Sequence, residues 1–387
     1  MKRRLTLACS LASLALAAVS PAQAQAAVFG AGSAAFGASL VPPTGENPVC
    51  DASAAAGSVC VGYTTLSELL LDESREHMQN LRTGIGTLRA GISPSILTDG
   101  SRMPWVDPCA VALTLTGSSA HHAGRGADGD YHSRSGGLML VAARALSSSL
   151  TLGADLSLSS ARAKNSGMTL SADSWYFDLV ADMGQGAFRR KAGIGIGVCA
   201  LDTKRFIIGS ADSGSSPVAL RGKRNSTVVN LFYEASYDLP LTRDGRHRLA
   251  PLALAEMSMA ELGRLTEQGS PQPNPVVSFD NDAEYLALAA GLRYTRAWGM
   301  RNKPGYFTLD ALIAQDIRSE GGSVSRFSGG VSPVHLHADR AGKTSLRLNA
   351  ALVHPLNTEW ALSARLSADI RSRKSMLGAA LGIRYTF

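Results

Sequence analysis

Long apolar runs are absent from this 387-residue chain beyond its first two dozen residues. A helix that crosses a bilayer needs about 20 consecutive apolar residues, so the sequence excludes a membrane helix after that point. The same absence does not exclude a barrel, because only every second residue of a barrel strand faces lipid. The spacing of the apolar residues therefore has to decide the fold class.

Cysteine is also scarce: the chain has five, and no two of them form a C-x-x-C pair. A zinc ribbon or a thiol redox motif is therefore not indicated. Cys50 and Cys60 bracket a small Ala/Ser/Gly segment and can close a disulfide in an oxidising compartment. Cys109 and Cys199 are expected to be unpaired, because the strands predicted below place them near opposite rims of a barrel.

Dense clusters of Lys and Arg interleaved with aromatic residues are missing as well. The formal net charge of +7 falls to +4 when Lys2, Arg3 and Arg4 are removed with the export signal described next. This modest balance gives no reason to expect nucleic acid as a partner.

The first 24 residues are typical of an export signal. Lys2-Arg3-Arg4 supplies the positive start, residues 5–19 are nearly all apolar, and Pro21-Ala22-Gln23-Ala24 offers a small-x-small cleavage site. We predict that residues 1–24 are a signal peptide cleaved after Ala24.

What the chain has instead of long apolar runs is alternation of apolar with small or polar residues. At the C-terminus the apolar positions are Leu377, Ala379, Leu381, Ile383, Tyr385 and Phe387. The positions between them are Gly378, Ala380, Gly382, Arg384 and Thr386. Segments 344–352 and 360–371 repeat the pattern. A period of two sustained over about ten residues indicates a strand rather than a helix.

Segments with this period occur twelve times after residue 104. They span 105–117, 136–146, 150–161, 170–183, 187–201, 226–239, 246–258, 284–297, 304–317, 344–355, 359–371 and 375–387. Lengths of about 10 residues or more suit strands that cross a bilayer at a tilt. The sequence therefore predicts an all-β fold, a transmembrane antiparallel barrel of about twelve strands.

The connections between the predicted strands alternate in length. Those after even-numbered strands are short, as at 146–149, 184–186, 242–245 and 356–358. Most of those after odd-numbered strands are long and rich in Gly, Ser, Asp and Pro, as at 118–135, 202–225, 259–283 and 318–343. Short periplasmic turns and long external loops are typical of outer-membrane barrels. This assignment puts both ends of the barrel in the periplasm.

A soluble β-sandwich or a lipocalin-like barrel also has alternating strands, but buries the apolar face inside. Mixed charges on the other face of these strands favour a water-filled lumen, with the apolar face toward lipid. The predicted pore-lining charges are Asp155, Asp178, Asp182, Glu234, Arg293, Asp310, Arg347, Arg365, Asp369 and Arg384.

The order and spacing of several motifs resemble the autotransporter β-domain of type V secretion. They are Asp128-Gly129-Asp130 before Gly136-Gly137, then Gly153-Ala154-Asp155-Leu156, Ser171-Ala172-Asp173-Ser174-Trp175-Tyr176 and Gly382-Ile383-Arg384-Tyr385-Thr386-Phe387. The resemblance covers about 280 of the 387 residues. The ending also resembles the signal that barrel-assembly machinery recognises, which assigns an assembly role to Leu381, Ile383, Tyr385 and Phe387.

The family implies a twelve-stranded barrel with a helix threaded through its pore, joining an exported N-terminal passenger to the first strand. Residues 65–82 are the candidate helix, because Thr65-Leu66-Ser67-Glu68 reads as a capping box and no Pro or Gly follows up to Arg82. Eighteen residues at ~1.5 Å each give ~27 Å, enough to cross the hydrocarbon core. A helix in the periplasm or on the cell surface is the alternative, since helix propensity alone does not place it.

The chain departs from the family in its passenger. Only about 40 residues separate the signal from the helix, and they are rich in Ala, Gly, Ser and Pro, too few to bury a core. The predicted organisation is a signal peptide (1–24), a short passenger-like segment (25–63), a helix with a linker (64–104) and the barrel (105–387).

The resemblance implies a translocator and anchor that exports or displays the N-terminal segment. An outer-membrane pore or adhesin-like barrel without passenger export is the alternative, and an outer-membrane hydrolase is a third hypothesis. Expected partners are outer-membrane lipid and lipopolysaccharide, the barrel-assembly machinery and periplasmic chaperones. We expect a monomeric barrel without a cofactor.

Few residues suit catalysis or metal binding outside the predicted lumen. A hydrolase site would use His132 and Ser133, but no nucleophile motif surrounds them. The candidate metal ligands are His121, His122, His335, His337 and Asp339. Isolated loop histidines are usually solvated polar groups, so we predict neither a catalytic nor a metal site.

Overall fold

The computed structural model describes residues 54–92, 109–123, 130–147, 149–164, 168–207, 218–268, 278–300, 303–326, 334–337 and 342–387. The segments 1–24 and 25–53, and therefore the predicted export signal, lie outside these residues.

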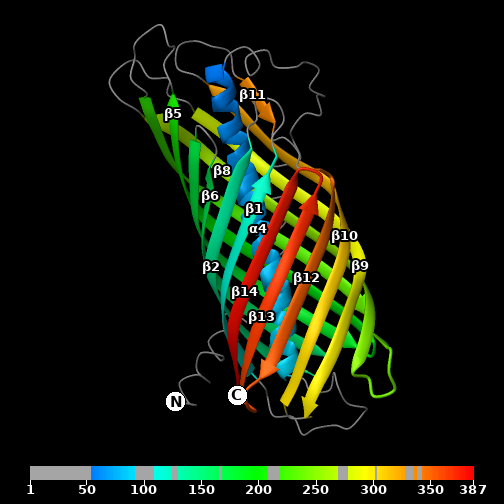
Figure 1. Ribbon diagram of the computed structural model, residues 1–387. Coiled ribbons are helices and arrows are strands. Elements are labelled where there is room, and N and C mark those ends of the chain that lie inside the picture. Colours follow the sequence, from blue (N-terminus) through cyan, green and yellow to red (C-terminus); the bar gives the residue numbers. More distant parts are fainter. Residues whose placement is uncertain are drawn as a thin grey trace, which may run out of the picture. The chain divides into compact units, whose positions relative to one another are not determined.

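Twelve long strands form the wall of a barrel (Figure 1). In chain order they are β1 (Cys109–His122), β2 (Tyr131–Ala145), β3 (Leu150–Lys164), β4 (Met168–Gln185), β5 (Phe188–Ile207), β6 (Val218–Tyr237), β8 (His247–Gln268), β9 (Ser278–Met300), β10 (Lys303–Arg326), β12 (Thr344–Pro355), β13 (Trp360–Arg371) and β14 (Lys374–Thr386). Two short strands, β7 (Leu239–Pro240) and β11 (Val334–His337), extend the pairing at the rims. Each of the twelve long strands overlaps one predicted segment, which confirms the predicted fold class.

The sheet closes on itself because the last strand pairs with the first. β1 and β14 are antiparallel, with Ala110 opposite Thr386, and the backbone N–H of Phe387 donates to the carbonyl of Cys109 at 2.9 Å. The remaining neighbours are antiparallel and follow chain order. Closure leaves no unpaired sheet edge, which is the condition for a sheet to cross hydrocarbon.

The apolar face of the barrel points outward. Leu115, Ile313 and Leu366 are 63%, 66% and 65% exposed, whereas their chain neighbours on the other face turn inward. The lipocalin-like alternative is therefore wrong, because it requires the apolar side chains to fill the barrel.

The short turns form where the sequence predicts them. Gly186 and Gly245 have φ of 61° and 64°, in the left-handed region that favours glycine. Near Gly245, the Asp244 carboxylate accepts hydrogen bonds from the Thr242 hydroxyl and the Arg246 backbone. At the opposite rim the strands run further than predicted, so β5 and β6 take up much of the 202–225 segment.

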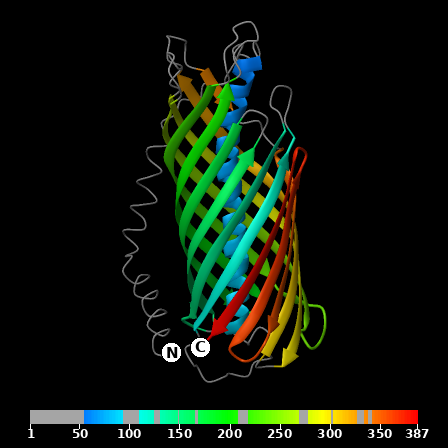
Figure 2. The same cartoon turned by 60° about the vertical axis from the view of Figure 1, so that its left-hand side comes forward.

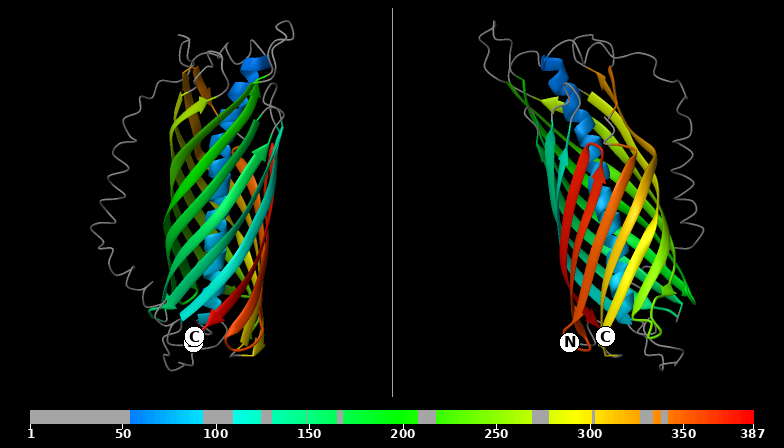
Figure 3. Two further views of the ribbon diagram at one scale, coloured as in Figure 1. Left: turned by 90° about the vertical axis from the view of Figure 1, so that its left-hand side faces the viewer. Right: turned by 45° about the vertical axis from the view of Figure 1, so that its right-hand side comes forward.

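One helix, α4 (Ala54–Ile92), lies inside the barrel along its length (Figures 2 and 3). Its 39 residues are more than twice the predicted 65–82, and at ~1.5 Å per residue they span about 58 Å. The predicted capping box at Thr65 is wrong, since this segment lies in the middle of the helix. Within the described residues, no helix is both long enough and apolar enough to cross a membrane.

Candidate functional site

The lumen of the barrel is occupied by α4, and this helix with its surrounding wall is the candidate functional site. Residues 69–74 of α4 are buried without interruption, on every side of the helix. A helix lying on a surface would keep one exposed face. The lumen is therefore plugged along α4 rather than open, which corrects the prediction of a water-filled lumen.

Two apolar clusters hold α4 against the wall. Leu69, Leu70 and Leu71 belong to one with Tyr176 and Tyr285 of the wall. The second contains Met78, Leu81, Ile85 and Leu88 of the helix, with wall residues such as Val141 and Leu254. The helix therefore makes apolar contacts with the wall at two levels. Its polar residues face the charged side chains of the wall.

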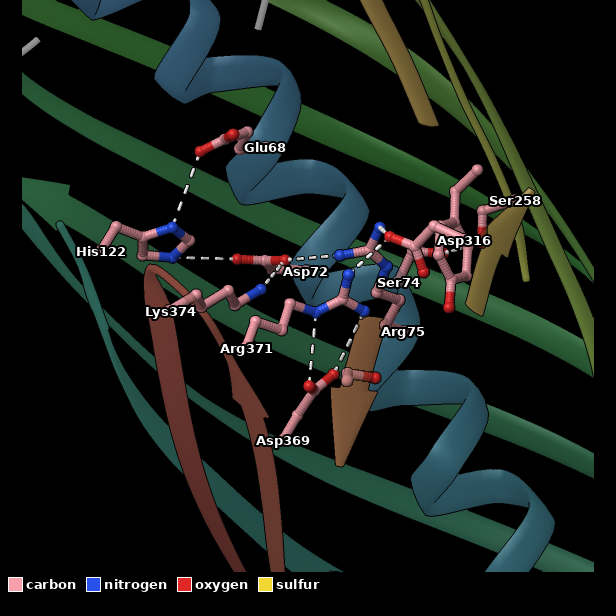
Figure 4. A network of polar contacts seen from close by, with 12 residues as sticks. Glu68, Asp72, Ser74, Arg75, His122, Ser258, Asp316, Asp369, Arg371 and Lys374 are labelled. Atoms are coloured by element: carbon pink, nitrogen blue, oxygen red, sulfur yellow. Dashed lines mark hydrogen bonds and ion pairs between the residues drawn. The ribbon is translucent and has the colours of Figure 1, made fainter. Parts of the chain in front are cut away.

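An ion-pair network surrounds Asp72 near the rim at which β1 ends (Figure 4). The Asp72 carboxylate accepts a hydrogen bond from the Lys374 ammonium, and lies 3.2 Å from Arg75 and 3.1 Å from the His122 ring. Lys374 begins β14 and His122 ends β1. One helical carboxylate therefore joins the helix to the seam where the barrel closes.

Arg75 extends this network across the lumen. Its guanidinium lies 3.7 Å from an Asp316 oxygen and 3.7 Å from the centre of the Tyr285 ring. Asp316 also accepts from Arg371 at 2.5 Å, and Arg371 lies 3.3 Å from Asp369 (Figure 4). Asp316, Asp369 and Arg371 are buried. Each of these charges therefore needs an oppositely charged neighbour to offset the cost of removing it from water.

A second network surrounds Glu234 on β6. The Glu234 carboxylate accepts from Arg82 of α4 at 2.5 Å and from Arg293 of β9 at 2.9 Å, and Lys191 of β5 lies 3.6 Å away. Arg293 also donates to Asp310 of β10 at 2.7 Å. The helix is thus bonded to β6 at this level, and Glu234 is itself linked to β5, β9 and β10.

Between the two networks the helix presents acidic groups to serine hydroxyls. Ser118 and Ser135 both donate to a Glu76 oxygen at 2.6 Å, and Ser159 donates to Glu73. His77 contacts Asp178 on β4 at 2.7 Å.

The predicted pore-lining charges lie on the inner face of the barrel. Nine of them are buried, and the side chain of Arg293 is 17% exposed. Sequence reasoning missed Glu256, Asp316, Arg371 and Lys374 as wall partners. Glu256 turns inward together with Leu252 and Leu254 and accepts from Arg347 at 2.5 Å, so the apolar-outward alternation of the other strands gives no signal for it.

The predicted assembly residues lie at the outer face of β14 and just beyond it. Leu381 and Ile383 are exposed, and the rings of Tyr385 and Phe387 meet edge to face with centroids 4.8 Å apart. Tyr385 also contacts Trp360 of β13. Their role in assembly remains a prediction.

The cysteine predictions have mixed outcomes. Cys199 is a buried free thiol, as expected. Cys109 is disulfide-bonded, so the prediction that it is unpaired is wrong. The proposed Cys50–Cys60 bridge lies outside the described residues, which include neither Cys50 nor the side chain of Cys60.

The other candidate residues do not converge on one site. His132 is exposed on the outer face of β2 while Ser133 is buried on the inner face, so these two side chains point apart. His121 and His122 are likewise on opposite faces of β1, with His122 in the Asp72 network. Asp339 and the side chains of His335 and His337 lie outside the described part of the chain.

Comparison with known proteins agrees with this architecture. The family model for the autotransporter beta-domain matches residues 111–367. The fold is similar to the translocator domain of the autotransporter NalP from Neisseria meningitidis, at 15% identity and a TM-score of 0.58, covering 82% of this chain and 97% of that one. It is also similar to the beta domain of the Bordetella autotransporter Brka, at 14% identity and a TM-score of 0.51, covering 73% of this chain and all of that one.

No curated protein matches the sequence. At these identities the two structures show the fold alone, a barrel of the kind found in the bacterial outer membrane. The family match covers about two thirds of the chain. The described residues outside it belong to the internal helix and to the ends of the same closed barrel. The chain belongs to the autotransporter β-domain family.

Proposed function

We propose that this protein is an outer-membrane translocator and anchor that displays its short N-terminal segment on the cell surface. Residues 1–24 direct export, and the segment from residue 25 to the start of α4 is displayed. The assembly machinery recognises Leu381, Ile383, Tyr385 and Phe387 and inserts the barrel into the outer membrane. The proposal includes no enzymatic step.

The direction of α4 is the observation that supports this proposal most strongly. Asp72 lies beside His122, the last residue of β1, whereas Leu88 shares a cluster with Ala110 near the start of β1. The helix therefore begins toward the rim with the long connections and ends toward the rim with the short turns. In an outer-membrane barrel these rims face outside and periplasm, respectively.

The interior contacts favour an anchor rather than a passage through which the helix is released. Breaking a buried ion pair by removing one partner costs about 3–5 kcal/mol. Withdrawal of α4 would separate Asp72, Arg75 and Arg82 from their wall partners at once. The polar contacts therefore support a helix that stays in the lumen after the segment ahead of it has reached the surface.

The short segment ahead of α4 favours one alternative, a pore or surface-interaction barrel without passenger export. Fewer than 30 residues lie between Ala24 and Ala54, too few to form an independent domain. Under this alternative the N-terminal segment stays in the periplasm.

An epitope tag inserted after Pro43 separates the two functions. Intact cells that bind the antibody support display, with a tag in the Thr242–Gly245 turn as a control that binds only after permeabilisation. If the Pro43 tag also requires permeabilisation, while heat-modifiable barrel is present in the outer membrane, display is wrong and the alternative stands.

A further inference from the structure

The buried carboxylates of the lumen are neutralised unevenly. Those at the levels of Arg75 and of Arg82 in α4 have Arg or Lys partners within ion-pair distance: Asp72, Glu234, Glu256, Asp310, Asp316 and Asp369. Among the described residues, no Lys or Arg lies within that distance of Glu73, Glu76, Asp155 or Asp178. Arg365 attracts Glu76 from further away and bonds to the carbonyl of Asn80.

Within the described part of the chain, the His77 imidazole is the only basic side chain within ion-pair distance of these four carboxylates. The Nε2 atom of His77 lies 2.7 Å from Asp178 and 3.9 Å from Asp155. Buried charge is tolerated when it is paired or when it binds a metal ion, because desolvation of a lone carboxylate is costly. The middle of the lumen therefore has more buried carboxyl groups than basic side chains within ion-pair distance of them.

The three nearest groups converge on one point. Asp155 on β3 and Asp178 on β4 are directly opposite in the antiparallel register, and both are 1% exposed. Their ligand oxygens and the His77 ring nitrogen all lie within 4.8 Å of one another. Oδ1 of Asp155 and Oδ1 of Asp178 have no hydrogen-bond partner although both atoms are buried.

The surroundings fix the orientation of these groups. The Tyr176 ring stacks on His77 with centroids 4.1 Å apart, and the Ser157 hydroxyl donates to Asp155 at 2.6 Å. Gly195 leaves room for the Asp178 carboxylate, because a Cβ at position 195 would lie 1.7 Å from its Oδ1. Metal ligands are commonly held by such second contacts.

We propose that His77, Asp155 and Asp178 bind one divalent transition-metal ion of the zinc class, which ties α4 to β3 and β4. One imidazole with two carboxylates is a donor set that zinc accepts, and Mg²⁺ or Ca²⁺, which prefer all-oxygen sites, do not match it. Ligand atoms around a tetrahedral zinc ion lie about 3.3 Å apart, given bonds of about 2.0–2.1 Å. The 2.7 Å and 3.9 Å separations each differ from that value by about 0.6 Å, and the separation of the two carboxylate oxygens, which is within 4.8 Å, exceeds it by at most about 1.5 Å.

A small cavity adjoins the cluster on the side of His77. It is lined by Glu73, Glu76, His77 and Ser157, among others, and by residues of β1, β2 and β3. A four-coordinate ion would take its fourth ligand from water on this side. The competing arrangement has no ion, with a protonated His77 bridging the two carboxylates.

Zinc titration of the mature chain tests the proposal. The untagged protein, purified from outer membranes in detergent and stripped with EDTA, is titrated with Zn²⁺ in competition with a chromophoric chelator. One equivalent of tight binding is expected, with no competition from a large excess of Mg²⁺ or Ca²⁺. Co²⁺ in place of Zn²⁺ is expected to give the visible absorption of a four-coordinate ion.

Matched variants assign the site. His77→Gln and Asp155→Asn are expected to weaken zinc binding about tenfold or more. Loss of a residue that only orients a metal ligand already costs about 10–100-fold in affinity, and these two variants each remove a ligand. His247→Gln and Asp244→Asn, which change the same residue types away from the lumen networks, are expected to bind as the unchanged protein does. Heat-modifiable migration shows that each variant is folded.

Absence of stoichiometric Zn²⁺ binding to the unchanged protein overturns the proposal and leaves the protonated His77 arrangement. Equal affinity in His77→Gln and His247→Gln also overturns it, by placing the ion elsewhere. If His77→Gln does not fold, Asp178→Asn replaces it and is judged by the same criterion. None of these outcomes depends on surface display of the N-terminal segment, so this test and the epitope test fail independently.

Discussion

At the scale of single residues, Glu234 of β6 joins three basic side chains in the part of the lumen around Arg82. It meets Arg82 of the helix and also Arg293 and Lys191 of the wall. A buried pair of this kind adds little net stability relative to apolar residues, but loss of one partner leaves the others without a counter-charge.

Glu234→Gln is therefore expected to destabilise the barrel by about 3–5 kcal/mol. The measurement is the temperature at which the folded band is lost in heat-modifiability gels. Asp244→Asn is the control, because Asp244 lies in an exposed turn. A Glu234→Gln melting temperature equal to that of the control would show that the network around Arg82 does not hold the helix.

Gly153 illustrates how a small wall residue accommodates the helix. A Cβ at this position would lie 2.3 Å from Cδ1 of Ile85 in α4. Gly153→Val is expected to cost about 1–3 kcal/mol through overpacking, and Ile85→Ala in the same chain is expected to recover part of that loss.

Recovery of stability in the Gly153→Val/Ile85→Ala double variant would show that the loss comes from a clash with the helix and not from a general effect on strand β3. Gly136→Val is the matched control, since Gly136 is exposed on the outer face and nothing in the helix is near it. Destabilisation of Gly153→Val that Ile85→Ala does not relieve would contradict the seating of α4 against this strand.

At the scale of elements, the strands could be predicted from the sequence and the helix only in part. Alternation is a local property, so segments such as 344–355 and 359–371 match β12 and β13 within a residue. The helix was predicted to begin too late because Thr65 was interpreted as a cap, and to end too early because Gly84 and Gly86 disfavour a helix. Inside the lumen, packing of Ile85 and Leu88 against the wall outweighs that propensity.

The polar site was predictable to the extent that it follows strand parity. The inward position of most charged strand residues follows from alternation. Their pairing with Asp72, Arg75 and Arg82 depends instead on how far the helix is inserted into the barrel. Neither the Lys374–Asp72 contact nor the His77 cluster has a local signal. Asp72 is 302 positions from Lys374, and His77 is 101 positions from Asp178 and 155 − 77 = 78 from Asp155.

Removal of the helix is expected to open the pore. Deletion of residues 25–92, with the signal peptide retained, takes away every described lumen contact of α4 and leaves a charged channel. In planar bilayers we expect large, stable conductance from the deletion variant and little from the full mature chain. Equal conductance of the two proteins would contradict a lumen that α4 fills.

At the scale of the whole molecule, the C-terminal residue connects folding with insertion. The Phe387 backbone closes the barrel through its bond to Cys109, and its ring contacts Tyr385. Phe387→Ser is expected to lower the amount of heat-modifiable barrel in outer-membrane fractions several-fold, while Thr386→Ser should not. A normal level for Phe387→Ser would contradict the predicted assembly role.

The exposed apolar face of the barrel must contact lipid if the protein spans the outer membrane. The most direct test of this contact is a nitroxide label at Leu366, which is 65% exposed, compared with one at the inward Arg365, in proteoliposomes. We predict that the Leu366 label is accessible to oxygen, which concentrates in lipid, and protected from a water-soluble nickel complex. A Leu366 label that the nickel complex reaches freely, or that neither reagent reaches, would contradict a barrel whose outer face lies in the membrane.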